Sequence, residues 1–177
     1  FFLYTGVELG LGMWTYLLLT ESRGVDPEVA GFVTGSYWGM FTVGRIFAGW
    51  YAKKIDVRKL IYLSISLALF GVALLLADSS QIITILGVTL AGFAIAPIFP
   101  GLVSSTTSRV GFRHQANTIG MQIAAAGLGV AVVPSIAGVL ARNFGLEVIP
   151  LYLLSILALL LLVFIISNSL SGEYTLD

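Results

Sequence analysis

Long apolar runs separated by short polar stretches dominate the sequence. A helix that spans a bilayer needs about 20 predominantly apolar residues, and the charged positions divide the chain into six runs near that length. The six runs are 1–20, 29–52, 60–77, 82–104, 115–141 and 148–167. They lack the alternation of apolar and polar residues that the strands of a membrane barrel require. The pattern therefore predicts an all-α polytopic membrane protein with six transmembrane helices.

The stretches between the runs are short, which makes consecutive helices antiparallel neighbours in one bundle. The connections are expected at 21–28, 53–59, 78–81, 105–114 and 142–147. Asp26 followed by Pro27 is typical of a helix start, with Asp26 as the N-cap. Pro97, Pro100 and Pro134 predict bends. We expect one transmembrane domain over residues 1–167 and a polar, disordered cytoplasmic tail over 168–177.

Composition agrees with a membrane protein and removes several function classes. The chain has 177 residues, 58% of them apolar and 10% charged, with zero formal net charge. This balance lacks the basic footprint of a nucleic-acid-binding protein. Without cysteine, and with one histidine, the chain lacks the residues of a disulfide framework, a thiolate metal site or a histidine metal cluster. It also lacks the GxSxG, HExxH and P-loop motifs, so we expect neither an enzyme nor a bound cofactor.

The nine basic residues are distributed unevenly. Seven of them, Arg45, Lys53, Lys54, Arg58, Lys59, Arg109 and Arg113, belong to one side of the predicted membrane, and Arg23 and Arg142 belong to the other. Because short cytoplasmic loops are enriched in Lys and Arg, both ends of this segment should face the cytoplasm, in a plasma or inner cell membrane. Trp50 and Tyr51 beside this basic stretch are typical of an interfacial aromatic belt.

Glu8 is the most informative single residue. An ionisable group inside a span costs at least about 2.5–3.5 kcal/mol on insertion scales and usually has a function. Helical spacing places Tyr4, Glu8 and Thr15 on one side of the first helix, with Trp14 at its flank. A carboxylate beside aromatic rings suits a polyhydroxylated ligand, because the acid accepts hydroxyl hydrogen bonds and a ring covers C–H groups. The alternatives are a protonated Glu8 that is hydrogen-bonded to a neighbouring helix, and a Glu8 that lies near a truncated helix end.

Other polar and aromatic residues within the runs are further binding candidates. Tyr37 and Trp38 lie well inside the second run, where they either line a pocket or fill packing space. Asn117 and Gln122 carry amides that lipid cannot satisfy, so they face other helices or a watery cavity. Gln122 either binds a ligand or joins helices, and Asn117 either binds a ligand or lies near the helix end. A stripe of small residues predicts close helix approach: Gly120, Ala124, Gly127, Ala131 and Gly138.

The stretch GRIFAGWYAKKIDVRKL resembles the loop signature of the major facilitator superfamily. That signature reads Gly, three residues, an acid, a base, one residue, Gly, one residue and two bases. The residues that match it or the Gly-Arg pair before it are Gly44, Arg45, Gly49, Lys54, Arg58 and Lys59. The sequence departs from it at Lys53, where an acid is expected, and at Asp56, where a glycine is expected. The resemblance implies a gating role for this motif.

The resemblance also implies which part of a transporter this is. Four segments, YTGVELGLGMW, GSYWGMFTVGR, FAIAPIFPGLVS and ANTIGMQIAAAGLGVAVVPSIAGVLA, are similar to helices seven, eight, ten and eleven of fucose-permease-like sugar porters. Six helices then form the C-terminal half of a twelve-helix bundle. Because the chain opens on Phe1 inside apolar sequence, we expect further sequence upstream. The implied partners are the lipid bilayer, the missing N-terminal six-helix half or a second copy, a small-molecule substrate and a proton.

The implied function is proton-coupled symport of a sugar by alternating access, with the substrate at mid-membrane between the halves. By position, this half of the cavity would be lined by Glu8, Trp14, Tyr37, Trp38 and Gln122, with Asn117 as a further candidate. Two alternatives remain: an exporter of drugs or other organic solutes, and a membrane sensor or structural subunit that does not transport.

Overall fold

The computed structural model describes residues 1–51, 54–77 and 80–173, with side chains up to residue 169. Within these ranges the regular elements are all helical, which confirms the all-α prediction. The elements are α1 Phe2–Leu17, the π-helical η1 Leu18–Ser22, α2 Pro27–Tyr51, α3 Val57–Ala77, α4 Gln81–Ile95, α5 Ile98–Ser104, α6 Thr106–Val110, α7 Phe112–Phe144 and α8 Val148–Glu173.

Five of the six predicted spans are helices long and apolar enough to cross a membrane. They are Phe2–Ser22, Val57–Ala77, Gln81–Val110, Phe112–Phe144 and Val148–Ser169. The remaining helix, α2, has 25 residues, about 37 Å at 1.5 Å per residue. Glycines, hydroxyl residues and Arg45 interrupt its apolar residues, so spanning by α2 remains a prediction.

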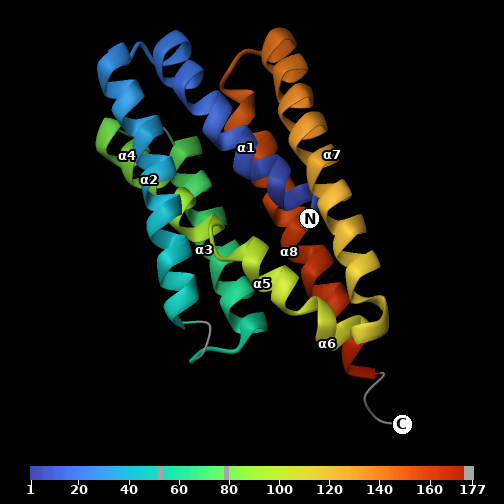
Figure 1. Ribbon diagram of the computed structural model, residues 1–177. Helices are drawn as coiled ribbons and strands as arrows, with labels where there is room; N and C mark the ends of the chain where they lie inside the picture. The colour runs from blue at the N-terminus through green and yellow to red at the C-terminus, as the bar shows by residue number, and fades with distance from the viewer. Residues whose placement is uncertain (52–53, 78–79, 174–177) are drawn as a thin grey trace.

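The helices pack into one bundle in which α1 lies between α2 and α7, as Figure 1 shows. Contacts are most extensive between α3 and α4, between α1 and α7, and between α2 and α4. The α3–α4 contact is close because it is formed by glycines: a Cβ atom added at Gly71 would lie 2.8 Å from the Gly87 carbonyl oxygen. Buried apolar side chains from all the long helices form a continuous core.

The fourth predicted helix is broken, as its prolines suggested. α4 ends at Ile95, and α5 begins after the buried Pro97 and contains Pro100. The expected connection 105–114 is wrong, because most of it is helical: α6 occupies Thr106–Val110 and α7 begins at Phe112. A single residue, Gly111, with a φ of 75°, separates α6 from α7. α7 continues through Pro134 as a single helix.

Two aspartates begin helices. Asp26 Oδ1 accepts hydrogen bonds from the backbone N–H groups of Glu28 at 2.9 Å and Val29 at 3.4 Å, which confirms the predicted cap of α2. Asp56 caps α3 in the same way, with Arg58 N at 2.9 Å and Lys59 N at 3.1 Å. Asp56, one of the two positions that depart from the loop signature, therefore has a local structural role.

The first part of the expected disordered tail is helical. α8 continues to Glu173, so residues 168–173 are helical, and 174–177 lie outside the described residues. The Asn168 side chain explains part of the difference, since it accepts a hydrogen bond from Arg109 at 2.7 Å and donates one to the Tyr62 hydroxyl at 3.2 Å. These contacts hold the end of α8 against α3 and α6.

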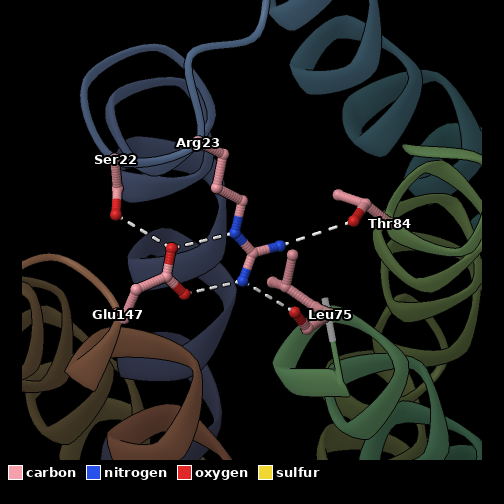
Figure 2. Close-up of polar contacts among 5 residues, drawn as sticks. All are labelled: Ser22, Arg23, Leu75, Thr84 and Glu147. Carbon is pink, nitrogen blue, oxygen red and sulfur yellow. Dashed lines mark hydrogen bonds and ion pairs between the residues drawn. The ribbon is translucent and has the colours of Figure 1, made fainter. Parts of the chain in front are cut away.

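A buried arginine joins several elements at the end of the bundle that contains connections 23–26 and 145–147, here called the Arg23 end (Figure 2). The Arg23 side chain is 6% exposed, and its Nη2 lies 2.7 Å from Glu147 Oε2. Nη2 also donates to the Leu75 carbonyl at 3.0 Å, and Nη1 donates to the Thr84 hydroxyl at 3.4 Å. Ser22 donates to Glu147 at 2.9 Å. One side chain thus connects η1, α3, α4 and the start of α8.

The same contacts change the acidity of Glu147. The hydrogen bond from Arg23 lowers the pKa of this carboxyl below its ordinary value, partial burial opposes the change, and the bond from Ser22 and the Arg23 charge add to it. Glu147 therefore stays ionised to lower pH than an exposed glutamate does.

Candidate functional site

Glu8 lies on α1, level with the middle of α2, and is buried with 9% of its surface exposed. The Tyr4 hydroxyl, one turn earlier on α1, is buried and has no hydrogen-bond partner among the described residues. It lies close enough to the Glu8 side chain to interact with it. The Tyr4 ring centroid lies 6.1 Å from that of Phe99 on α5. A carboxylate and a hydroxyl are thus presented together beside aromatic rings. Tyr4 was placed on the Glu8 face by helical spacing, whereas Phe99 had no sequence signal.

Arg45 approaches this pair from α2. Its guanidinium carbon lies 4.5 Å from the centroid of the Phe41 ring, one turn earlier on the same helix. Its charge acts electrostatically on both Glu8 and Tyr4. Arg45 also lines a cavity of about 400 Å³ together with Phe99 and other residues of α2, α3 and α5. The sequence assigned Arg45 to the loop motif; the structure shows that it also belongs to the surroundings of Glu8.

Tyr37 and Trp38 differ in their environment although they are adjacent. Tyr37 is fully buried, and its hydroxyl donates a 2.9 Å hydrogen bond to the backbone carbonyl of Glu8. Trp38 is 37% exposed, and its ring lies so close to Gly12 that a Cβ atom there would overlap it. Tyr37 therefore fits the packing alternative and supports α1. Trp38 presents an open ring one turn beyond Glu8.

Trp14 and Gln122 both make contacts between helices. The Trp14 indole N–H donates to the Pro134 carbonyl at 3.1 Å, and its ring packs against Gly138 of α7. Gln122 Nε2 and the Thr106 hydroxyl are hydrogen-bonded at 3.0 Å, which joins α7 to α6. Asn117 is exposed on α7. For Gln122 the helix-joining alternative fits this geometry.

The loop-motif residues are spread over packing, capping and the surface. Gly44 is required by close packing, since a Cβ there would overlap the Phe93 carbonyl, whereas Gly49 has open space around it. The Lys54 ammonium lies 5.5 Å from the Trp50 ring centroid. Arg58 and Lys59 are exposed at the start of α3. The remaining motif position, Lys53, lies outside the described residues.

Much of the predicted small-residue stripe on α7 faces outward. Its members Gly120, Ala124, Gly127 and Ala131 are exposed, and a Cβ at Gly120 or Gly127 would meet nothing within 4 Å. Within the described bundle, the close helix approach that the stripe predicts is found at Gly138, which contacts Trp14. The buried face of α7 is formed by Ala126, Gly129, Val133, Pro134 and Ala137. On α2, Gly31, Gly35 and Gly39 are similarly open.

Comparison with known proteins decides the family. The sequence model described as Major Facilitator Superfamily matches residues 1–172. The chain belongs to the Major Facilitator Superfamily. The loop-motif resemblance is thereby confirmed at the level of the superfamily, and the chain is a multi-pass membrane protein of a family of small-solute transporters rather than enzymes.

Individual relatives are more distant. The chain is 27% identical over 160 residues to bypass of stop codon protein 6 of Saccharomyces cerevisiae, covering 85% of this chain and 32% of that protein. It is 27% identical over 140 residues to a putative glucose/galactose transporter of Helicobacter pylori, covering 78% of this chain and 33% of the relative. A second Helicobacter pylori strain has a putative glucose/galactose transporter that is 26% identical over 139 residues, with 77% and 33% coverage. The chain spans about a third of the length of these relatives.

Proposed function

We propose that this chain forms the C-terminal half of a proton-coupled sugar transporter that works by alternating access. The observation that carries the proposal is the Glu8 carboxylate held beside the Tyr4 hydroxyl near the middle of the bundle. A buried ionisable group in a membrane helix is a functional site by default. The two putative glucose/galactose transporters among the relatives favour a hexose as substrate.

The roles of the site residues follow from their surroundings. Glu8 accepts hydrogen bonds from sugar hydroxyls, and Tyr4 supplies a further hydroxyl from one turn away. The exposed Trp38 ring covers the C–H face of the sugar. Tyr37 and Trp14 position α1 through their bonds to backbone carbonyls. Asn117, exposed on α7, and Gln122, once released from Thr106, add amides to the cavity.

The open faces of α2 and α7 support a second six-helix unit as partner. Glycines there leave room for close approach of another helix, and polar groups beside α1 would otherwise face lipid at a high cost. We assign this place to an N-terminal half that resembles this one, with a second copy of this chain as the alternative. In this proposal the side that carries seven of the nine basic residues is cytoplasmic, so both ends of the segment face the cytoplasm, in the plasma or inner membrane.

Arg45 couples Glu8 electrostatically to the basic motif during the proposed transport cycle. It lies between the basic motif and Glu8, so a change in the charge or occupancy of Glu8 alters its electrostatic environment. In our proposal, the motif with Arg45 stabilises the outward-open state, and sugar shifts the balance by its differential affinity for the two states.

Uptake by the intact protein in proteoliposomes tests the proposal, with a panel of hexoses and an imposed proton gradient. We expect uptake of at least one hexose that rises when the gradient is imposed and stops when it is dissipated. Accumulation of organic cations or drugs with no hexose uptake would instead indicate an exporter. Sugar binding without uptake would indicate a sensor.

A further inference from the structure

An apolar groove of about 230 Å³ lies between α2, α3 and α4 at the end of the bundle that contains connection 52–56, here called the Lys54 end. Its walls are aliphatic and aromatic, and Leu63 in the α3 wall is 61% exposed. The groove follows α3 from Leu60 to Leu67, about 10 Å at 1.5 Å per residue. Side chains that line it include Phe47, Tyr51, Ile55, Leu60, Leu63 and Phe93.

Two exposed lysines, Lys54 and Lys59, adjoin lining residues of the groove along the chain. Lys54 lies between the lining residues Tyr51 and Ile55, and its ammonium is 5.5 Å from the Trp50 ring centroid. Lys59 is exposed and precedes Leu63 by four residues, which places both on one face of α3. Asp56 is the acid of this connection, and its Oδ1 is occupied by the helix cap.

We propose that this groove binds an anionic phospholipid of the bilayer, with one acyl chain along α3 and the phosphate at Lys54 and Lys59. Charge complementarity selects this occupant, because basic clusters at membrane helix ends attract anionic headgroups. The exposed Trp50 and Tyr51 are the residue types that lie at headgroup level. Glu8 and Arg45 do not line the groove, and the proposal does not rest on the proposed sugar transport.

The groove suits a lipid better than a polar solute. Gly44, Ala48, Ala94 and Pro97 add further apolar surface to its walls. The lining hydroxyl of Ser64 belongs to a residue that is 4% exposed. A sugar in the groove would lose hydrogen bonds to water without replacing them, whereas an acyl chain loses none.

The experiment is a lipid titration of the intact, detergent-solubilised protein followed by native mass spectrometry. Phosphatidylglycerol and phosphatidylcholine with identical chains are compared. We expect preferential binding of phosphatidylglycerol. The double variant Lys54→Gln/Lys59→Gln should weaken that binding by roughly fivefold for each cation removed, with phosphatidylcholine binding unchanged.

Arg58→Gln is the control for each single loss of charge, because it removes one cation from the same connection. Four residues after Arg58, Tyr62 packs on Phe164 of α8 at 4.8 Å between ring centroids, so Arg58 lies on the α8 side of α3. Arg58→Gln should leave phosphatidylglycerol binding within about twofold of the wild type, a shift below half a kcal/mol.

A second variant tests the groove itself. Leu63→Trp fills the exposed wall while both cations remain, and it should weaken binding of both lipids. The proposal is overturned if the wild type binds the two lipids equally or if the double variant keeps its phosphatidylglycerol affinity. It is also overturned if Arg58→Gln loses as much affinity as the double variant, or if Leu63→Trp changes nothing.

Discussion

The backbone of Glu8 is held in place by a hydrogen bond from the neighbouring helix α2. Tyr37 donates to the Glu8 carbonyl, and Gly12, one turn later, leaves room for the Trp38 ring. Arg45 contributes a positive charge from the second helix. Side chains that support the helix are thus distinct from those that present polar atoms.

Tyr37→Phe should destabilise the fold by about 1 kcal/mol, the usual net value of one hydrogen bond. The expected result is a lower unfolding temperature with sugar affinity changed by less than about twofold, a shift below half a kcal/mol. Thermal unfolding and ligand titration measure the two effects, with Tyr16→Phe as a control because Tyr16 is 38% exposed. A large loss of affinity without loss of stability would place the Tyr37 hydroxyl in the binding site instead.

Arg45→Ala should lower the rate of transport more than it lowers substrate affinity. The physical reason is that Arg45 stacks on Phe41 and acts on Glu8 through its field, so it biases conformations rather than contacting the sugar. Initial uptake rates and equilibrium binding measured on one preparation separate the two effects. A loss confined to affinity would contradict this role.

The charge of Glu8 was enough to predict it as a candidate site residue, because an acid inside an apolar run is conspicuous in any sequence. Helical spacing also predicted that Tyr4 shares its face. The roles of Tyr37 and Gln122 could not be decided, since the partners of their polar groups, Glu8 on α1 and Thr106 on α6, lie on other helices. Tertiary packing, which periodicity does not encode, determines those contacts.

At the scale of elements, glycine contacts and one arginine hold the helices together. The α3–α4 contact depends on Gly71 and Gly87, whose backbones approach closely. The Arg23 end is joined through Glu147, Leu75 and Thr84. The first interaction is steric and the second is electrostatic, so they respond to different perturbations.

Gly71→Ala should destabilise the bundle by about 2 kcal/mol, within the usual cost of overpacking. The added Cβ would lie 2.8 Å from both Ala91 N and Gly87 O, which are backbone atoms, so the helices must separate. Gly49→Ala is the control, because a Cβ there meets nothing within 4 Å. Denaturation midpoints report the difference, and equal midpoints for the two variants would refute the close contact.

Acid should weaken the Arg23 end. Because the pKa of Glu147 is lowered by folding, the contact contributes its full stability above the ordinary carboxyl pKa and loses it as pH falls through the lowered value. Glu147→Gln should therefore be less stable than the wild type at neutral pH and approach it in acid. Unfolding temperatures over a pH series check this, with Glu28→Gln as an exposed control. A stability difference that is constant across the series would contradict the account.

Capping chemistry predicted the start of α2, since Asp26 and Pro27 act locally, and Pro97 and Pro100 predicted a bend where the fourth helix is broken. The short helix α6 escaped prediction because polar residues such as Ser105, Ser108 and Arg109 resemble a loop. The serine hydroxyls instead donate to backbone carbonyls one turn earlier, as Ser108 does to the Ser105 carbonyl at 2.9 Å. Local polarity was therefore a poor guide where side chains satisfy a helix.

At the scale of the whole molecule, α1 and its acid lie between two helices that expose glycines. The sequence predicted the small-residue stripe on α7 but not the side of the helix that faces the bundle, because α7 carries small residues on more than one face. Ala126 and Gly129 face α1, whereas Gly120 and Gly127 face outward. The open faces of α2 and α7 result from the arrangement of all the helices, and we propose that a second six-helix half packs there.

Sugar binding by the intact protein with Glu8→Gln tests the central claim most directly. The substitution keeps the size of the side chain and removes its charge, and Glu21→Gln is the control because Glu21 is exposed. We predict that Glu8→Gln abolishes hexose binding or weakens it at least about tenfold, as expected for a lost charged hydrogen bond, while Glu21→Gln binds normally. Unchanged binding and uptake in Glu8→Gln would remove Glu8 from the site and contradict the account.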